Sequence, residues 1–122
     1  GVRPEASVTA ESENWDGAKL NPEPRANTTL VCVATDAALT RADAKRVAQM
    51  ASAGVARAIR PVFAPFDGDV VFALSTAAKP LSEPKPLALA RIGAMAADCV
   101  ARAIARGVYE AAAVGVHKAW RD

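Results

Sequence analysis

Two short runs rich in β-branched residues, each followed by an alanine-rich segment, constrain the fold of this chain more than any other feature. Residues 28–35 (TTLVCVAT) and 70–76 (VVFALST) are almost wholly apolar, which is typical of strands covered on both faces. Residues 41–60 and about 87–106 repeat small apolar side chains at helical spacing. The order strand, helix, strand, helix predicts a mixed fold of the α/β or α+β class.

The first predicted helix has a clear beginning and a clear end. Thr40 is a candidate N-cap, and Asp43 follows it at the spacing of a capping box. Pro61 ends the helix because proline lacks the backbone N–H that a helix interior requires. The expected inward stripe consists of Ala44, Val47, Ala48, Ala51, Val55, Ala58 and Ile59.

The second predicted helix runs over residues 87–106, and Gly107 is its expected C-cap. Asp98 and Arg102 lie four residues apart on its polar side, where they are expected to pair. The expected apolar stripe consists of Ile92, Met95, Ala96, Cys99 and Ala103. Because an isolated pair of strands is marginal, we expect another segment or another subunit to complete the sheet.

The composition excludes several kinds of site. Fifteen Lys and Arg against 13 Asp and Glu give a net charge of +2, which is too even to favour nucleic acid or an anionic membrane as a partner. No apolar run approaches the ~18–20 residues that span a bilayer. The single histidine, His117, disfavours a Ser-His-Asp, Cys-His or His-rich metal site. We expect no metal and no cofactor.

The cysteines and the first 27 residues indicate the setting of the chain. Cys32 and Cys99 are too few for a disulfide scaffold, and we interpret them as core thiols. With no recognisable export signal, they favour the cytoplasm. Residues 1–27 are polar, rich in proline and carry five acidic against three basic side chains, so we expect a linker there.

Thr28 is the residue from which acyl-transfer chemistry can start in a chain with one histidine. It stands where the polar segment meets the first predicted strand. If the Asn27–Thr28 bond is cut, Thr28 carries a hydroxyl and a free α-amine. An α-amine has a pKa of about 7.7–8.0, so it can act as the base for its own hydroxyl. The alternative is a threonine that simply opens a strand.

Asp67, Gly68 and Asp69 form the second candidate group, just before the second strand. We expect a tight turn whose central glycine needs glycine-like dihedral angles, so that the two carboxylates point to one place. Such a pair can orient an amine, relay a proton or hold a cation, although an ordinary Asp-Gly turn is the alternative. If the strands are neighbours, Thr28 and Asp69 lie close together.

Four segments taken together carry a family resemblance: residues 27–36, 39–40, 54–61 and 66–74. They resemble the small-subunit region of nylon-oligomer hydrolases. These enzymes are grouped with L-aminopeptidase/D-esterase-type peptidases and with ornithine acetyltransferases. The resemblance covers about residues 27–106, and it depends on the segments occurring in combination.

This resemblance implies a precursor that cleaves itself between Asn27 and Thr28. Residues 1–27 would be the C-terminal end of the large-subunit portion, and residues 28–122 the small, nucleophile-bearing subunit. The implied fold is part of a four-layer α/β/β/α sandwich, which the upstream large subunit completes. The implied assembly is a homo-oligomer of such heterodimers, usually a tetramer.

The resemblance also implies the site and the reaction. Thr28 would be the nucleophile, and Asp67 and Asp69 would match the acidic pair that supports it; the large subunit would supply a Lys and an Asn. The reaction would be hydrolysis of 6-aminohexanoate oligomers or peptide-like amides through an acyl-enzyme on Thr28. Three alternatives stay open: an aminopeptidase or esterase acting on short peptides, acyl transfer of the ornithine-acetyltransferase type, and a non-enzymatic β-α-β-α assembly module.

Overall fold

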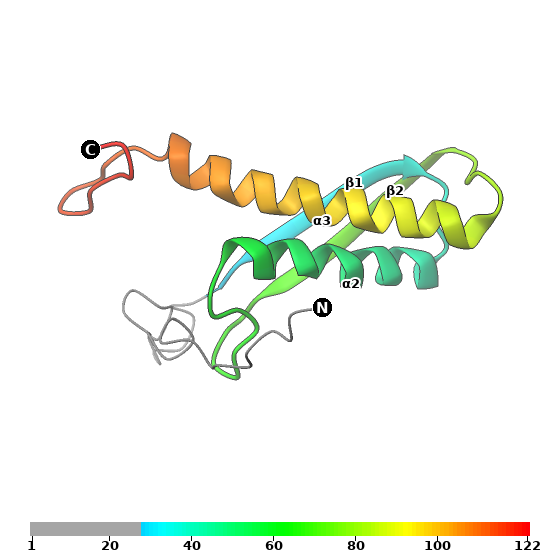
Figure 1. The fold of residues 1–122 in the computed structure, drawn as a ribbon, viewed down its shortest axis with the longest axis horizontal. Coiled ribbons are helices and arrows are strands. Elements are labelled where there is room, and N and C mark those ends of the chain that lie inside the picture. Colours follow the sequence, from blue (N-terminus) through cyan, green and yellow to red (C-terminus); the bar gives the residue numbers. More distant parts are fainter. Residues whose placement is uncertain (1–27) are drawn as a thin grey trace, which may run out of the picture.

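The computed structural model describes residues 28–122, which form a mixed α/β domain (Figure 1). Its elements are β1 (Leu30–Ala37), α2 (Arg41–Ala58), β2 (Val70–Lys79) and α3 (Lys85–Glu110). This order confirms the strand, helix, strand, helix prediction. The expected linker of residues 1–27, with Asn27 at its end, lies outside the described residues.

The two strands pair in parallel, and α2 makes the crossover between them. The register aligns Leu30 with Val70 and continues to Thr35 with Ser75. It shifts between Thr35 and Ala37, which pairs with Lys79. Because the strands run in the same direction, the residues that precede them lie at the same end of the sheet.

Both helices cover one face of the sheet (Figure 1). A buried cluster of Val47, Ala51 and Val55 from α2 with Ala96 and Val100 from α3 forms the centre of the core. Alternate strand residues, including Val31, Val33 and Val71, pack against it. The core therefore lies between the sheet and the helix pair.

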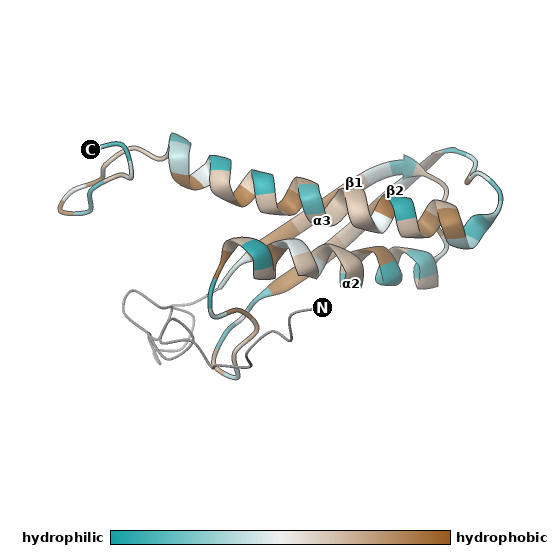
Figure 2. Cartoon of the chain, viewed as in Figure 1, coloured by the Kyte–Doolittle hydropathy of each residue, from teal (hydrophilic) through white to brown (hydrophobic). Residues whose placement is uncertain are grey.

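The opposite face of the sheet is apolar and bare in the described part of the chain. Leu30, Phe72 and Leu74 are 70%, 57% and 55% exposed. Figure 2 shows that the apolar colouring extends along both strands. Within residues 28–122 the helices cover only one face of β1, so the expected burial of its other face stays a prediction that depends on a further segment or subunit.

The N-terminus of α2 forms as its sequence predicts. The backbone N–H of Asp43 donates to the Thr40 hydroxyl at 3.2 Å, and the N–H of Thr40 donates to the Asp43 carboxylate at 3.1 Å. This capping box is complete. The helix ends at Ala58, with Ile59 as its C-cap, before the proline that was expected to end it.

Helix α3 is longer than predicted, and the face that it buries differs in part from the predicted face. It continues through Gly107 to Glu110, so Gly107 is not its C-cap. Its buried residues are Ala88, Gly93, Ala96, Ala97 and Val100, whereas Met95 is 65% exposed. Small residues pack here because α2 approaches closely: an added Cβ at Gly54 would collide with the Ala97 carbonyl.

Two further expectations for side chains are wrong. Cys32 and Cys99 are both exposed in the described structure, because Cys32 lies on the bare face of the sheet and Cys99 lies outside the buried stripe of α3. Asp98 forms its ion pair with Arg57 of α2 at 2.6 Å, not with Arg102. Within residues 28–122, no helix is both long and apolar enough to cross a membrane.

Candidate active site

The parallel register brings Thr28 and the Asp67–Asp69 segment to the same end of the sheet. The N–H of Val70 donates to the carbonyl of Thr29 at 3.0 Å, which extends the pairing beyond the first strand residue. The N–H of Thr29 in turn donates to Oδ1 of Asp69 at 2.7 Å. The Asp69 carboxylate therefore holds the backbone of the residue that follows Thr28.

The second oxygen of Asp69 reaches the loop between α2 and β2. Oδ2 accepts the backbone N–H of Phe63 at 3.0 Å. One half-buried carboxylate thus joins the segment before β1, the segment before β2 and the connecting loop. Hydrogen bonds to an ionised carboxylate are stronger than those between neutral groups, so this junction is well fixed.

Asp67 closes a turn in the same loop. Its N–H donates to the carbonyl of Ala64 at 2.8 Å, and its Oδ2 accepts the N–H of Ala64 at 3.0 Å. The turn therefore spans residues 64–67, with Pro65 and Phe66 at its corners. The expected turn centred on Asp67 and Gly68 is wrong, because these residues already run toward β2.

Gly68 has a different role from the expected one. Its backbone lies outside the left-handed region, so the turn does not require glycine for its dihedral angles. Instead, a Cβ built on Gly68 would lie 2.5 Å from Oγ1 of Thr28 and 3.4 Å from its Cγ2. The Thr28 side chain therefore lies directly against Gly68, between the two aspartates in the sequence, and the missing Cβ makes room for it.

The structure thus brings together Thr28, Asp67 and Asp69, which the sequence singled out separately. A hydroxyl packed against a segment that carries two carboxylates is suited to nucleophilic chemistry in which an amine or water must be oriented and protons moved. Asn27 lies outside the described residues. Among residues 28–122, no group of three or more His, Cys, Asp or Glu side chains could hold a metal ion.

Sequence reasoning missed the backbone groups that hold the aspartates. The donors are the successive N–H groups of Phe63 and Ala64, whose side chains carry no signal for this role. Only the nearby Pro61 and Pro65 marked the segment as a loop. A cavity of about 370 Å³ adjoins Asp69 and Phe63, with Lys45, Gln49 and Ser52 of α2 on its far side.

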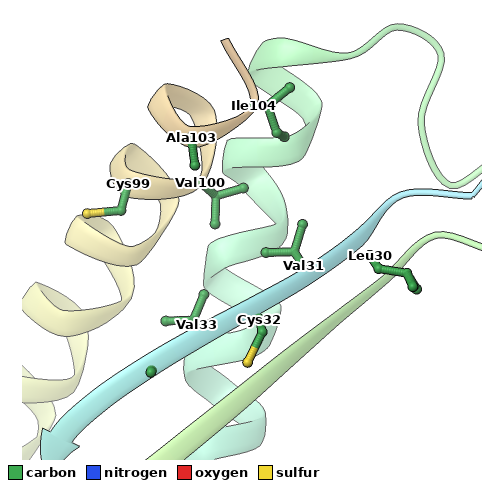
Figure 3. Close-up of a pocket in the computed structure, with 9 residues that line it drawn as sticks. Leu30, Val31, Cys32, Val33, Cys99, Val100, Ala103 and Ile104 are labelled. Atoms are coloured by element: carbon green, nitrogen blue, oxygen red, sulfur yellow. The ribbon is translucent and has the colours of Figure 1, made fainter. Parts of the chain in front are cut away.

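A second cavity, of about 380 Å³, lies along β1 beneath α3 (Figure 3). Val31 and Val33 point from β1 toward the helices, whereas Cys32 points the other way (Figure 3). The lining is apolar except for cysteine thiols. The side chains that line this cavity therefore include no charged group and no hydroxyl, in contrast to those near Thr28.

The sequence of the chain is similar to those of known peptidases. Residues 2–120 match peptidase family S58. Uncharacterized aminopeptidases of Mycobacterium bovis and Mycobacterium tuberculosis are each 42% identical over 105 residues, which is 79% of this chain and 30% of theirs. An uncharacterized aminopeptidase of Mycobacterium leprae is 42% identical over 97 residues, 72% of this chain and 27% of its own. The chain spans about 30% of the length of these relatives. Because the family match covers nearly every residue, the chain belongs to peptidase family S58.

Proposed function

We propose that this chain carries the nucleophile of an N-terminal-threonine amidohydrolase that cleaves amide bonds through an ester on Thr28. The observation that carries the proposal is the packing of the Thr28 hydroxyl against Gly68, the residue that stands between Asp67 and Asp69 in the sequence. Membership of a peptidase family supports amide hydrolysis. The relatives that are named aminopeptidases support it as well.

The first chemical step of the proposal releases the nucleophile. The Thr28 hydroxyl attacks the carbonyl carbon of Asn27, and the peptide C–N bond breaks as the Thr28 nitrogen takes the proton. Water then hydrolyses the resulting ester, which leaves Asn27 with a carboxylate and Thr28 with a free α-amine. An uncut Thr28 has no such amine, so self-cleavage precedes substrate hydrolysis.

Substrate hydrolysis uses the same hydroxyl. The amine of Thr28 accepts the hydroxyl proton while the oxygen attacks the substrate carbonyl, and the leaving amine of the substrate departs with that proton. Water hydrolyses the acyl ester and restores the hydroxyl. Asp69 accepts the N–H of Thr29, beside the nucleophile, and that of Phe63 in the loop. Asp67 accepts the N–H of Ala64 and so holds the same loop.

The length of the relatives and the bare face of the sheet support a large subunit as the partner in the proposed assembly. Residues 28–122 form the small subunit, and the large subunit comes from the same precursor. A second sheet from the large subunit covers Leu30, Phe72 and Leu74, which gives the four-layer α/β/β/α sandwich. Four such heterodimers form the proposed tetramer.

Peptide-like amides are the first choice of substrate, because the relatives are named aminopeptidases. Oligomers of 6-aminohexanoate present the same linear amide bond and are the second choice. Acyl transfer of the ornithine-acetyltransferase type differs in its acceptor, which is an amine in place of water. Supplying an acetylated donor with and without an amine acceptor distinguishes the two: the proposal expects release of free acid in both cases.

The test is the intact mass of the full-length protein under denaturing conditions, together with its amidase activity. We expect a fragment that begins at Thr28, and we expect Thr28→Ala to abolish both cleavage and hydrolysis. Thr28→Ser retains a hydroxyl and should keep both at a lower rate. Ser82→Ala, which removes an exposed hydroxyl in the connection between β2 and α3, is the control and should behave as wild type. Normal cleavage of Thr28→Ala would refute the mechanism.

A further inference from the structure

Phe63 adopts a backbone conformation that side chains other than glycine rarely take. Its φ is 54°, in the left-handed region. Its side chain is 46% exposed, so burial of the ring does not explain why the conformation is kept. The preceding residue, Val62, packs against the core and anchors the loop there. We therefore looked for the reason in the backbone N–H groups whose directions this φ determines.

Those groups are two successive N–H donors, and both point to carboxylates of the candidate site. The N–H of Phe63 donates to Asp69 and that of Ala64 to Asp67, each at 3.0 Å. A left-handed residue next to a residue of ordinary conformation turns successive N–H groups toward one side, where they bind negative charge. The loop at residues 63–64 is thus a backbone cradle for the aspartate pair.

The cradle is linked to the nucleophile by one further hydrogen bond. Oδ2 of Asp69 accepts a hydrogen bond from the N–H of Phe63 at 3.0 Å, and Oδ1 accepts one from the N–H of Thr29 at 2.7 Å. A different backbone φ at Phe63 would therefore break the hydrogen bond to Oδ2 of Asp69. The carboxylate would then be free to rotate, which would weaken its hydrogen bond to the N–H of Thr29. Thr28 immediately precedes Thr29, and its hydroxyl lies against Gly68, the neighbour of Asp69.

We propose that Phe63 is a positioning residue of this site: its left-handed backbone holds Asp69, and through Asp69 and Thr29 it fixes the Thr28 hydroxyl. This inference rests on the proposed amidohydrolase function. It assigns the role to the backbone of Phe63 and not to its aromatic ring. A residue that accepts the left-handed conformation should therefore substitute for phenylalanine, and a residue that resists it should not.

The test compares Phe63→Gly with Phe63→Val in the full-length protein. Glycine adopts the left-handed conformation freely, whereas the β-branched valine strongly disfavours it, and both keep the N–H donor. We expect Phe63→Val to lower kcat and the self-cleavage rate by at least tenfold, with KM changed by less than about twofold. We expect Phe63→Gly to stay within about threefold of wild type in all three quantities.

Ala77 provides the matched control. It has the same φ of 54°, and its N–H donates to the Ser75 hydroxyl at 3.2 Å. It lies eight residues beyond Asp69 along β2, roughly 25 Å away at the rise of a strand. Ala77→Val and Ala77→Gly should leave kcat and self-cleavage at wild-type values, because strain at that end of the sheet does not reach the nucleophile.

Hydrogen exchange of the backbone amides gives a readout that needs no activity. In the folded full-length protein, Phe63→Val should accelerate exchange in peptides covering residues 28–30 and 61–69, and Phe63→Gly should not. Equal kcat losses in both variants, or wild-type kcat and exchange in Phe63→Val, would overturn the inference. An inactive, uncut wild-type protein would refute the proposed function alone, because the exchange comparison still decides whether Phe63 holds Asp69.

Discussion

At the scale of single residues, Gly68 shows that a motif can be recognised for the wrong reason. The sequence suggested a glycine needed for its dihedral angles, but the backbone there is open to other residues. What the site requires is the absence of a Cβ beside the Thr28 hydroxyl. Contacts between segments 40 residues apart leave no mark on local sequence, so only the folded chain reveals this requirement.

Gly68→Ala is therefore predicted to impair catalysis more than folding. The new Cβ would lie 2.5 Å from Oγ1 of Thr28, so the hydroxyl must rotate away from its position. We expect kcat to fall at least tenfold, about 1.4 kcal/mol in activation free energy, as measured with the full-length protein. The free energy of unfolding, from urea titration, should change by less than about 1 kcal/mol.

Gly107→Ala is the control for this variant. Gly107 lies inside α3 with open space around it, so alanine should stabilise the helix by up to about 1 kcal/mol without changing kcat. Wild-type kcat in Gly68→Ala would contradict the placement of Thr28. A similar loss of kcat in both variants would show that the effect is not specific to the site.

At the scale of elements, local signals predicted local structure well and packing poorly. Thr40 and Asp43 form the capping box that their spacing predicts, because a cap involves only neighbouring residues. The stripe of α3 was predicted only in part: Ile92 and Ala96 lie in the core, whereas Met95 and Cys99 are exposed, because alanines surround this helix and several faces are equally apolar. Only the approach of α2 selects the face that carries Gly93 and Val100.

The same lesson holds at the candidate site. Thr28, Asp67 and Asp69 were identified from sequence because their side chains have chemistry of their own. The cradle at Phe63 and Ala64 was not identified, because its donors belong to the backbone and any residue has them. Predicting it would have required the φ of Phe63, which the residue type does not reveal because phenylalanine rarely adopts a positive φ.

The start of α2 also predicts how stability depends on pH. The pKa of Asp43 is lowered to about 2 from its ordinary value of 3.8. The main cause is the hydrogen bond from the Thr40 hydroxyl, and the second is the Lys85 ammonium, which lies 2.9 Å from the carboxylate. Since the folded state favours the carboxylate, this contribution is present above pH 3.8 and is lost as the pH falls to about 2. Acid should therefore weaken the cap.

Asp43→Asn tests this contribution. The variant should be less stable than wild type at neutral pH, and its unfolding temperature should fall less steeply as the pH is lowered from 3.8 to about 2. Thermal unfolding of the full-length protein, followed by circular dichroism across this range, makes the comparison. Parallel curves for the two proteins would show that Asp43 does not contribute through its charge.

At the scale of the whole molecule, the sheet is the part that is incomplete in the described residues. Its two strands have open edges on both sides, and one face exposes Leu30, Phe72 and Leu74. Two strands and two helices bury little apolar surface for their size. The relatives, of whose length this chain spans about 30%, have ample chain to cover that face.

Comparing two phenylalanines tests whether the face is covered in the full-length protein. Phe72 is 57% exposed and Phe66 is 43% exposed, so the described residues alone predict the larger effect at Phe66. If a second sheet covers Phe72, the order reverses: Phe72→Ala should cost about 3 kcal/mol of unfolding free energy, and Phe66→Ala less than about 1 kcal/mol. Urea titration measures both, and an unreversed order would refute the four-layer arrangement.

The parallel register also determines where the gene tolerates insertions and deletions. A slip of one residue between β1 and β2 would move Asp69 by about 3.3 Å and turn its side chain to the opposite face of the sheet. Length changes in residues 59–69, between α2 and β2, therefore threaten activity even where the fold survives. The connection at residues 80–84 lies at the other end of β2. Natural and engineered variation in length should accumulate there, because it alters no distance between Thr28 and the aspartates.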